Sequence, residues 1–334
     1  MIDQRYVRRE QIGSGGMSRV WLGHDTLLDR PVALKELGHA PGAAEPDTER
    51  AEREAQLTAT VRHPNVVVVY DVVEQDSRLW LVMEHVDGDT LSRMCLPRGL
   101  PTARVAHLLA PVADALATAH AQDVVHRDVK PSNILVGTGD VAKLGDFGVA
   151  RRGDDAVLTR TGLISGSPGY VAPEVALGRP ANAASDVWAF GATLYQACTG
   201  RTAFDITDDP IQSLENIVRN APPCLPDAHP LATIVADALN REPEDRPTMR
   251  MVADHLEQVQ AEQVDTAPSA EVTPIIEAPR VRRRKGGAHA GPRRPSPVWQ
   301  SVIALTGTRR DDEPTLVAAK AQDGVAEGDA ATPA

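Results

Sequence analysis

The chain has 334 residues, of which 42% are hydrophobic and 24% charged, and it carries a formal net charge of −11. This length and composition are typical of a soluble globular protein with one large or two modest domains. Residues 1–262 carry 25 Lys and Arg against 37 Asp and Glu, whereas residues 263–334 carry 10 against 9. Because the main part is acidic, we expect no nucleic-acid partner.

The cysteines and the apolar runs of the sequence indicate in which cellular compartment the protein is expected. Cys95, Cys198 and Cys224 are widely spaced and follow no metal-binding or disulfide pattern, so we expect reduced thiols. No apolar run approaches the ~18 to 20 residues that a membrane helix requires. The N-terminus, MIDQRYVRRE, lacks the apolar core of a secretory signal. We therefore expect a cytoplasmic protein without a transmembrane helix.

In chain order, stretches rich in Val, Leu and aromatic residues predict strands, and turn residues separate them. The predicted strands are residues 6–12, 19–25, 30–37, 65–74 and 78–86. One helix is expected over residues 47–61, with Asp47 or Thr48 as its N-cap. Residues 1–86 therefore predict a small, largely antiparallel sheet with one helix.

From residue 87 onward the apolar spacing becomes helical. The predicted helices are residues 102–122, 185–200 (with Gly200 as C-cap), 209–220, 229–240 and 248–259. After residue 262, Pro, Ala and Arg replace the apolar period, which indicates a flexible tail over residues 263–334. The expected class is α+β, with a sheet lobe (1–86) and a larger, mainly helical lobe (87–262).

Lysine is rare and placed unevenly. Only five of the 35 basic residues are lysine, and residues 1–262 contain three: Lys35, Lys130 and Lys143. An ammonium is a compact point charge and differs in this respect from a planar guanidinium. The three positions are therefore candidates for specific chemistry.

The segment VVHRDVKPSNILV, residues 124–136, places five polar or charged side chains between two apolar runs. They are His126, Arg127, Asp128, Lys130 and Asn133. A buried strand would not tolerate so many polar groups unless they formed a site. Their order matches the kinase catalytic loop H-R-D-L-x-x-x-N, with valine in the leucine position.

A second motif, KLGDFGVA, begins thirteen residues after Lys130. D-F-G alone indicates only a turn, but after the catalytic-loop pattern it predicts a metal site. Asp146 and Asn133 would supply oxygen ligands to Mg²⁺, or Mn²⁺, bound against ATP phosphates.

Two upstream residues fit the same chemistry. Lys35 in PVALKEL lies on a predicted strand, where V-A-I-K places a phosphate-binding lysine, although a surface lysine is the ordinary alternative. Glu54 shares one helix face with Leu57 and Val61. A carboxylate on an inward face needs a cation, and Lys35 is the candidate.

The glycine-rich stretch IGSGGMSRVWLG, residues 12–23, is either a phosphate loop or a plain turn. It offers Gly13 and Gly15, but Ser18 stands where the third glycine of G-x-G-x-x-G would be. The downstream motifs favour the phosphate loop.

Over residues 6–260 the chain resembles the eukaryotic-like serine/threonine protein kinases of bacteria. The segments HDTLLDRPVALK and LVMEHVDGDTL look most like the actinobacterial branch. The resemblance implies a two-lobed kinase fold and transfer of the ATP γ-phosphoryl group to Ser and Thr hydroxyls of protein substrates. It further implies that Asp128 orients the acceptor and takes its proton, that Lys130 neutralises the γ-phosphate, and that Lys35 and Glu54 act with them.

The resemblance also implies which residues contact the nucleotide. Met83 would be the gatekeeper, and residues 84–86 the hinge against adenine. The implied nucleotide-binding set is Ile12, Gly13, Ser14, Gly15, Gly16, Val20, Ala33, Lys35, Met83, Glu84, Val86 and Leu135.

Other implied roles concern scaffold and regulation. Glu174 of the A-P-E element would pair with Arg246, and Asp186 would hold the catalytic-loop backbone. Autophosphorylation is implied at Thr159 and Thr161, with Arg127 as a candidate phosphate ligand. Ser167 would lie near the acceptor, and Gly145 stands before D-F-G where a larger residue is usual, so a more mobile turn is expected there.

Two other functions stay open as alternatives: a pseudokinase scaffold and a kinase-like small-molecule phosphotransferase. Expected partners are protein substrates, phosphothreonine-binding domain proteins, a Ser/Thr phosphatase and a second copy bound through the sheet lobe. The basic run RVRRRK at residues 280–285 favours a solvated linker over a docking segment for anionic lipid or a partner.

Overall fold

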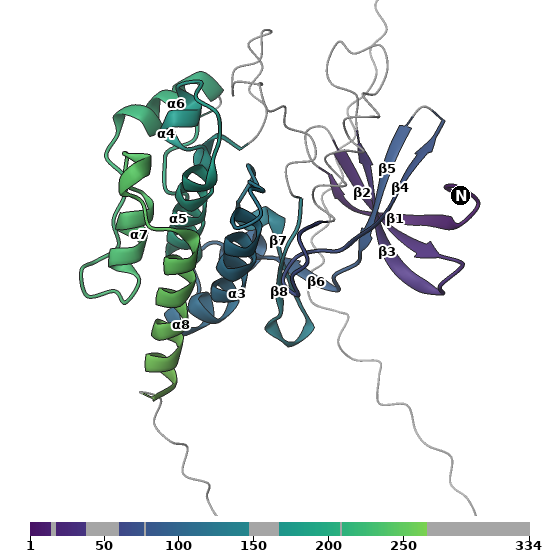
Figure 1. The fold of residues 1–334 in the computed structure, drawn as a ribbon, viewed down its shortest axis with the longest axis horizontal. Helices are drawn as coiled ribbons and strands as arrows, with labels where there is room; N and C mark the ends of the chain where they lie inside the picture. Colours follow the sequence, from purple (N-terminus) through teal and green to yellow (C-terminus); the bar gives the residue numbers. More distant parts are fainter. Residues whose placement is uncertain (15–17, 38–59, 77, 147–166, 208, 266–334) are drawn as a thin grey trace, which may run out of the picture. The chain divides into compact units, whose positions relative to one another are not determined.

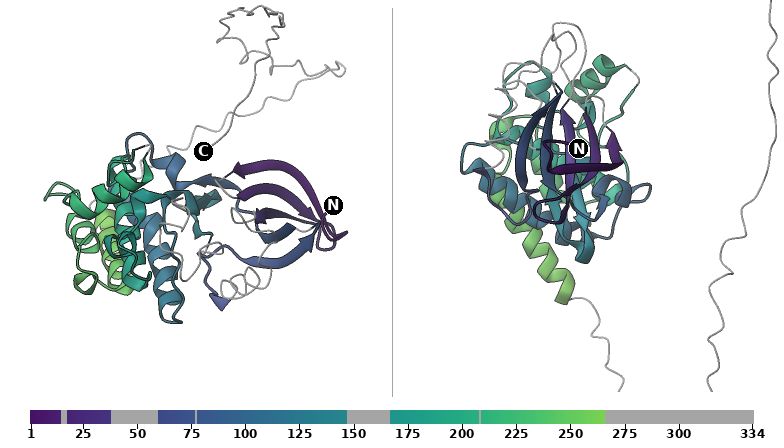
Figure 2. Two further views of the ribbon diagram at one scale, coloured as in Figure 1. Left: turned by 90° about the horizontal axis from the view of Figure 1, so that it is seen from above. Right: turned by 90° about the vertical axis from the view of Figure 1, so that its right-hand side faces the viewer.

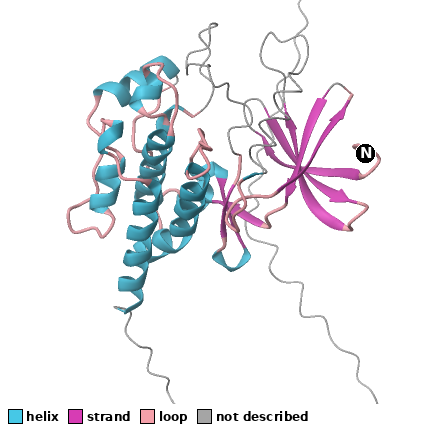
Figure 3. Cartoon of the chain, viewed as in Figure 1, coloured by secondary structure: helices cyan, strands magenta, loops and turns pink. Residues whose placement is uncertain are grey.

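The computed structural model describes residues 1–14, 18–37, 60–76, 78–146, 167–207 and 209–265. The chain divides into two compact units, Met1–Ala270 and Glu271–Ala334, and every described residue belongs to the first. Within this unit one part is built mainly of strands and the other mainly of helices (Figures 1 and 3). The architecture confirms the predicted two-lobed α+β class.

Five strands form one antiparallel sheet with the order β1-β2-β3-β5-β4, so β3 occupies its centre. Figure 2 shows these strands lying side by side. Their bounds are Tyr6–Ser14 (β1), Ser18–Asp25 (β2), Arg30–Leu37 (β3), Val69–Gln75 (β4) and Arg78–Glu84 (β5). All five predicted strands are present.

Alternation along β3 sends its side chains to two different apolar clusters. Val32 and Leu34 pack with residues of one cluster, and Ala33 packs with Met83 in the other. Lys35 points to the same face as Ala33 and is only 8% exposed. The sheet therefore holds the Lys35 ammonium beside the second cluster.

Strand β4 begins four residues later than the sequence pattern predicts. The preceding segment pairs with residue 144 instead: Leu144 N donates to Asn65 O at 2.7 Å, and Val67 N donates to Leu144 O at 2.9 Å. The apolar run over 65–69 is thus shared between two partners. Its first part joins the sheet lobe to the helical lobe.

A second, three-stranded sheet has the order β6-β7-β8, with bounds Gly88–Thr90, Ile134–Gly137 and Ala142–Leu144. None of these three strands is among the strands predicted above, because strands this short carry no readable alternation. Strand β7 follows Asn133 directly, and β8 ends two residues before Asp146. Pairing of β7 with β8 therefore brings the two predicted metal ligands toward each other.

The five helices predicted for the helical lobe are present, together with two helices too short to show a period. The bounds are Leu91–Cys95 (α2), Thr102–His120 (α3), Pro173–Ala176 (α4), Ala183–Thr199 (α5), Pro210–Arg219 (α6), Ala232–Ala238 (α7) and Met249–Asp265 (α8). Gly200 caps α5 at a φ of +71°, which confirms the predicted C-cap. The helix predicted over residues 47–61 lies outside the described residues except for residues 60 and 61.

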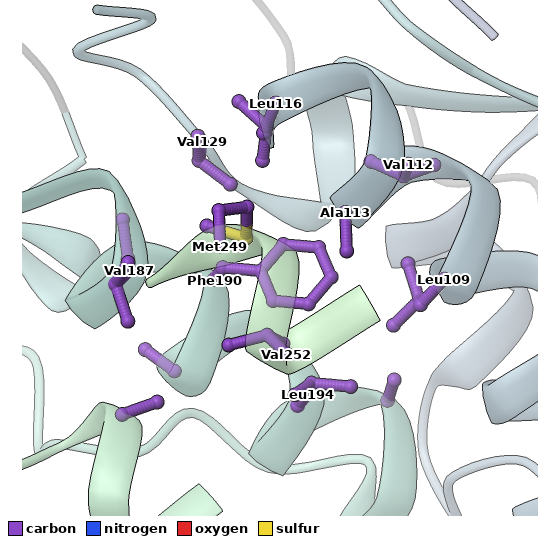
Figure 4. Close-up of a cluster of buried hydrophobic side chains, with 14 of the residues drawn as sticks. Leu109, Val112, Ala113, Leu116, Val129, Val187, Phe190, Leu194, Met249 and Val252 are labelled. Atoms are coloured by element: carbon purple, nitrogen blue, oxygen red, sulfur yellow. The ribbon is translucent and has the colours of Figure 1, made fainter. Parts of the chain in front are cut away.

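The largest apolar cluster lies between α3, α5 and α8. Figure 4 shows the Phe190 ring of α5 among side chains that include Leu109 of α3 and Val252 of α8. All three are fully buried. Burial of one such side chain stabilises the fold by about 1.5–3 kcal/mol. Helix α5 is therefore fixed along its length, and this positions the carboxylate of Asp186 in its first turn.

Candidate active site

The carboxylate of Asp128 is held by two neighbours in its own loop. Asn133, at the end of the 3-10 turn Pro131–Asn133, donates from Nδ2 to the Asp128 carbonyl oxygen at 2.8 Å and to Oδ2 at 3.0 Å. Lys130 Nζ lies 2.8 Å from the same Oδ2. A charge-assisted pair and an amide hydrogen bond on one oxygen fix the orientation of this carboxylate.

The backbone just before Asp128 is strained. Arg127 adopts a φ of +67°, a conformation that costs a non-glycine residue on the order of 1–3 kcal/mol. The buried carboxylate of Asp186 accepts the N–H of His126 at 2.7 Å and the N–H of Arg127 at 2.9 Å. Since a hydrogen bond to a charged group contributes about 1.5–3 kcal/mol, the two bonds offset the strain. The predicted role of Asp186 is confirmed.

His126 is fully buried and links the loop to the segment before Asp146. Burial lowers its pKa, although the nearby carboxylate of Asp186 acts in the opposite direction. Nδ1 accepts the Asp128 N–H at 3.2 Å, and Nε2 lies 3.0 Å from Gly145 O. These partners fix a neutral ring with its proton on Nε2, which donates to the carbonyl.

Lys35 reaches across from β3 to Asp146. Its Nζ lies 2.7 Å from Asp146 Oδ1, and the two side chains are 10% and 36% exposed. Asp146 itself has a φ of +57°. The short carboxylate side chain tolerates this left-handed conformation better than most residues. The partner predicted for Lys35 was Glu54, which lies outside the described residues.

A backbone hydrogen bond brings Asn133 close to the residue before Asp146. Gly145 N donates to Asn133 O at 2.8 Å, so one predicted ligand contacts the residue that precedes the other. Asn133 donates to Asp128 from Nδ2, so its amide oxygen lies on the other side of the group. A carboxylate and an amide oxygen form a hard donor set, which fits Mg²⁺ or Mn²⁺.

The apolar residues expected to hold adenine lie in one cluster. Ala33 and Met83 are buried at 7% and 8% exposure, and they face each other in register between β3 and β5. Val20, Val86 and Leu135 are partly buried and pack against them. Residues from four separate segments thus meet beside Lys35. Ile12 is 48% exposed and lies outside this cluster.

Several predicted site residues lie outside the described part of the chain. They are Gly15 and Gly16 of the glycine loop, Glu54, and the phosphorylation candidates Thr159 and Thr161. The backbone of Ser14 ends β1, paired with Arg19, and Gly13 pairs with Val20.

The A-P-E element is fixed as the sequence predicts. Arg246 donates to both carboxylate oxygens of Glu174 at 2.8 Å, and Ser185 Oγ donates to one of them at 2.9 Å. Burial acts to raise the pKa of Glu174, but the hydrogen bonds from Arg246 prevail and lower it. Ser167, five residues before the A-P-E element (Ala172, Pro173 and Glu174), accepts from Lys130 Nζ at 3.4 Å.

Sequence reasoning missed two contacts of the site. It gave Asn133 only a metal role, whereas its amide also orients Asp128. It expected a mobile turn at Gly145, yet both backbone groups of Gly145 are hydrogen-bonded, and a Cβ there would meet only ordinary contacts at 3.5 Å or more. The Asn133 contact depends on how the loop before β7 folds back on itself, and the Gly145 contacts depend on how β7 and β8 pair, so neither is evident from a local pattern.

Comparison with known proteins agrees with this geometry. Residues 6–256 match the protein kinase domain family. The chain is 40% identical over 205 residues to the serine/threonine-protein kinase PknL of Mycobacterium tuberculosis, a match that covers 61% of this chain and 51% of the relative. It is 38% identical over 205 residues to PrkC of Bacillus subtilis, covering 61% of this chain and 32% of the relative.

A longer match, at 36% identity over 257 residues, is to PknB of Mycobacterium leprae and covers 73% of this chain and 41% of the relative. The chain thus spans between about a third and a half of the length of these three relatives. Within the part that the structure describes, no helix combines the length and the apolar character that a membrane crossing requires.

Proposed function

Since the chain belongs to the protein kinase domain family, we propose that it is a serine/threonine protein kinase that transfers the γ-phosphoryl group of ATP to protein hydroxyls. One observation carries the proposal: the Asp128 carboxylate, fixed by Asn133 and Lys130, stands in the same site as the Lys35–Asp146 pair. Phosphoryl transfer requires mainly positioning and charge neutralisation, which these groups supply.

Asp128 is the proposed catalytic base. Its carboxylate orients the acceptor hydroxyl and takes its proton as the new P–O bond forms and the bond to ADP breaks. Lys130 stabilises the charge that develops on the transferred group, and its second contact, Ser167 Oγ, leads to the A-P-E element. Lysine at this position, rather than arginine, is the basis for proposing serine and threonine acceptors.

Lys35 is the proposed ligand of the α- and β-phosphates, and Glu54 its proposed partner from the predicted helix. Asn133 and Asp146 would hold the divalent cation, for which we propose Mg²⁺ or Mn²⁺. When bound, the cation neutralises phosphate charge. Since Lys35 already contacts Asp146, one ion pair positions both the phosphate-binding ammonium and the carboxylate that would hold the cation.

We propose that the nucleotide-binding set named from the sequence holds ATP, with adenine against the apolar cluster of Val20, Ala33, Met83, Val86 and Leu135. Backbone groups of residues 84–86 would hydrogen-bond the base. The glycine loop, including Ile12, Gly13, Ser14, Gly15 and Gly16, would approach the phosphates through its backbone.

Activation by autophosphorylation at Thr159 and Thr161 is a further part of the proposal. The support is their place between D-F-G and A-P-E, with Arg127 next to Asp128 as the phosphate ligand. Mass spectrometry of active protein should find phosphate on both. If both were unmodified, and a Thr159→Ala/Thr161→Ala variant kept full activity, this part would be wrong.

The organisation of the chain and its partners complete the proposal. We propose a sheet lobe over 1–86, a helical lobe over 87–262, a tail over 263–334 whose first three residues continue α8, and a cytoplasmic location. Proposed partners are protein substrates, phosphothreonine-binding domain proteins, a Ser/Thr phosphatase and a second copy bound through the sheet lobe. Sedimentation analysis tests the last of these.

The test of the function is incubation with ATP, Mg²⁺ or Mn²⁺, and a mixture of proteins, followed by mapping of the phosphorylated residues. Phosphoserine and phosphothreonine in proteins are the expected products. Nucleotide binding without transfer would favour a pseudokinase. Phosphate found only on small molecules would favour a phosphotransferase of another class.

A further inference from the structure

Lys143 is the lysine of the arginine-rich main domain that the proposed chemistry does not use. It lies in β8, three residues before Asp146, and is the cross-strand partner of Leu135 in β7. The other two lysines of this domain lie in the site itself. A lysine at position 143 therefore needs a separate explanation.

The Lys143 ammonium is bound to the carboxylate of Glu84. Nζ lies 3.0 Å from both Oε1 and Oε2. The two side chains are only 19% and 23% exposed, so water screens this pair less than an ordinary surface pair. An ammonium centred between two carboxylate oxygens is a directed contact.

Glu84 is the last residue of β5, and its carboxylate also contacts the segment that precedes β4. Oε2 accepts the Val68 N–H at 3.3 Å, and Glu84 N donates to Val68 O at 2.8 Å. The Glu84 backbone is thus held from one side by the segment before β4. The Lys143 ion pair holds the side chain of the same residue from β8.

Two surfaces that would face a bound adenine are joined in this way. One surface is formed by Met83 and Val86, on either side of Glu84 in the sequence. The other is formed by Leu135 of β7, which is the cross-strand partner of Lys143 in β8. The ion pair therefore fixes the separation between the segment 84–86 and the strand that carries Leu135.

We propose that Lys143 is a positioning residue for nucleotide recognition: its ion pair with Glu84 sets the spacing between the hinge segment 84–86 and β7–β8. The inference rests on the proposed use of ATP. Lys143 is not among the residues proposed to contact the phosphates or the acceptor. Its loss should weaken binding of the base without slowing the transfer step.

The test compares Lys143→Met, which keeps the length of the side chain and removes its charge, with Lys143→Arg, which keeps the charge. Arg104→Met is the matched control. It removes an ion pair of 2.8 Å to Asp140, at the turn that joins β7 to β8, away from Glu84. Dissociation constants for adenosine and for ADP are measured by competition against a fluorescent nucleotide, and kcat and KM for ATP are measured alongside.

Lys143→Met should weaken the binding of adenosine and the binding of ADP by the same factor, about three- to tenfold, as expected for loss of one partly buried ion pair. The KM for ATP should rise similarly, with kcat within about twofold of the parent. Lys143→Arg and Arg104→Met should bind both ligands as the parent does. Adding Glu84→Gln to Lys143→Met should weaken binding little further, because the interaction is already lost.

Unchanged adenosine binding in Lys143→Met, even with a lower melting temperature, would overturn the proposal, since the pair would then serve stability alone. A loss confined to ADP, or a fall in kcat with unchanged KM, would also overturn it. If the parent bound adenosine but transferred no phosphate, the kinase function would fail while the adenosine comparison still decided the role of Lys143.

Discussion

Lys35 Nζ of β3 lies 2.7 Å from Asp146 Oδ1, which follows β8 by two residues. The pair joins the centre of the five-stranded sheet to the end of the small sheet. A cation and a carboxylate that approach this closely bring the proposed phosphate ligand and the proposed metal ligand to one point. Substitution of either residue should therefore affect nucleotide and metal use together.

Lys35→Met removes the ammonium and leaves the aliphatic stem in its buried place. We expect kcat/KM for phosphoryl transfer to fall by at least about 10², because a preorganised charge at the phosphates is lost. Adenosine binding should change less than twofold in a competition assay. Equal loss of adenosine and ATP binding would place Lys35 away from the phosphates.

Asp186→Asn should slow catalysis through the backbone of the loop. The amide can accept only one of the N–H groups of His126 and Arg127, and its NH₂ group would oppose the other. We expect kcat to fall about 10- to 100-fold while KM for ATP stays within threefold, since a small misplacement of Asp128 suffices. Asp237→Asn on α7 is the control and should match the parent. An unchanged kcat in Asp186→Asn would contradict this role.

His126 should make stability depend on pH. Its pKa is lowered in the folded protein because the ring is buried, so the unfolded chain binds the proton more readily. The contribution of the neutral ring is complete above the unfolded pKa of about 6.5 and decreases as the pH falls below it. The urea midpoint of unfolding should decrease from pH 7.5 to pH 5.5, and this decrease should be larger for the parent than for His126→Phe. Identical decreases would contradict the assignment.

Removal of one partner from the buried pair of Glu174 and Arg246 should strongly destabilise the protein. The Arg246 side chain is fully buried and that of Glu174 is 5% exposed, so removal of one partner leaves a buried charge. Arg246→Met should lower the free energy of unfolding by about 3–5 kcal/mol. Glu174→Gln/Arg246→Met should cost less than the sum of the single variants, as urea denaturation would show. Additive costs would mean that the pair is not coupled.

Strong local signals made much of the fold predictable. Apolar residues bounded by turn residues predicted β3 with its observed bounds, Arg30–Leu37, and helical apolar spacing predicted α3 and α5 to α8. Strands β6 to β8 have only three or four residues, which is too few for a period to appear. The late start of β4 reflects pairing of Asn65 and Val67 with Leu144, a long-range contact with no local pattern.

The candidate site was predictable in its residue types but not in its contacts. Asp128, Asn133, Asp146 and Lys35 follow from motif order, because phosphoryl transfer needs a base, oxygen ligands and a cation. Contacts such as that of Lys35 with Asp146 depend on how distant strands pack. The same holds for Lys143: the sequence shows that lysine is rare in this domain, but it does not show that Lys143 pairs with Glu84.

The most direct test of the central claim compares Asp128→Asn with Asp123→Asn. Both change an aspartate to the isosteric amide in neighbouring turns, but Asp123 is exposed and has a φ of +58°, which asparagine also adopts. Transfer of labelled γ-phosphate to protein Ser and Thr is measured for each, at saturating ATP and Mg²⁺. We predict that Asp128→Asn loses about 10²–10⁴ in rate and that Asp123→Asn matches the parent. Equal labelling by Asp128→Asn and the parent would contradict the proposal that this site performs the transfer.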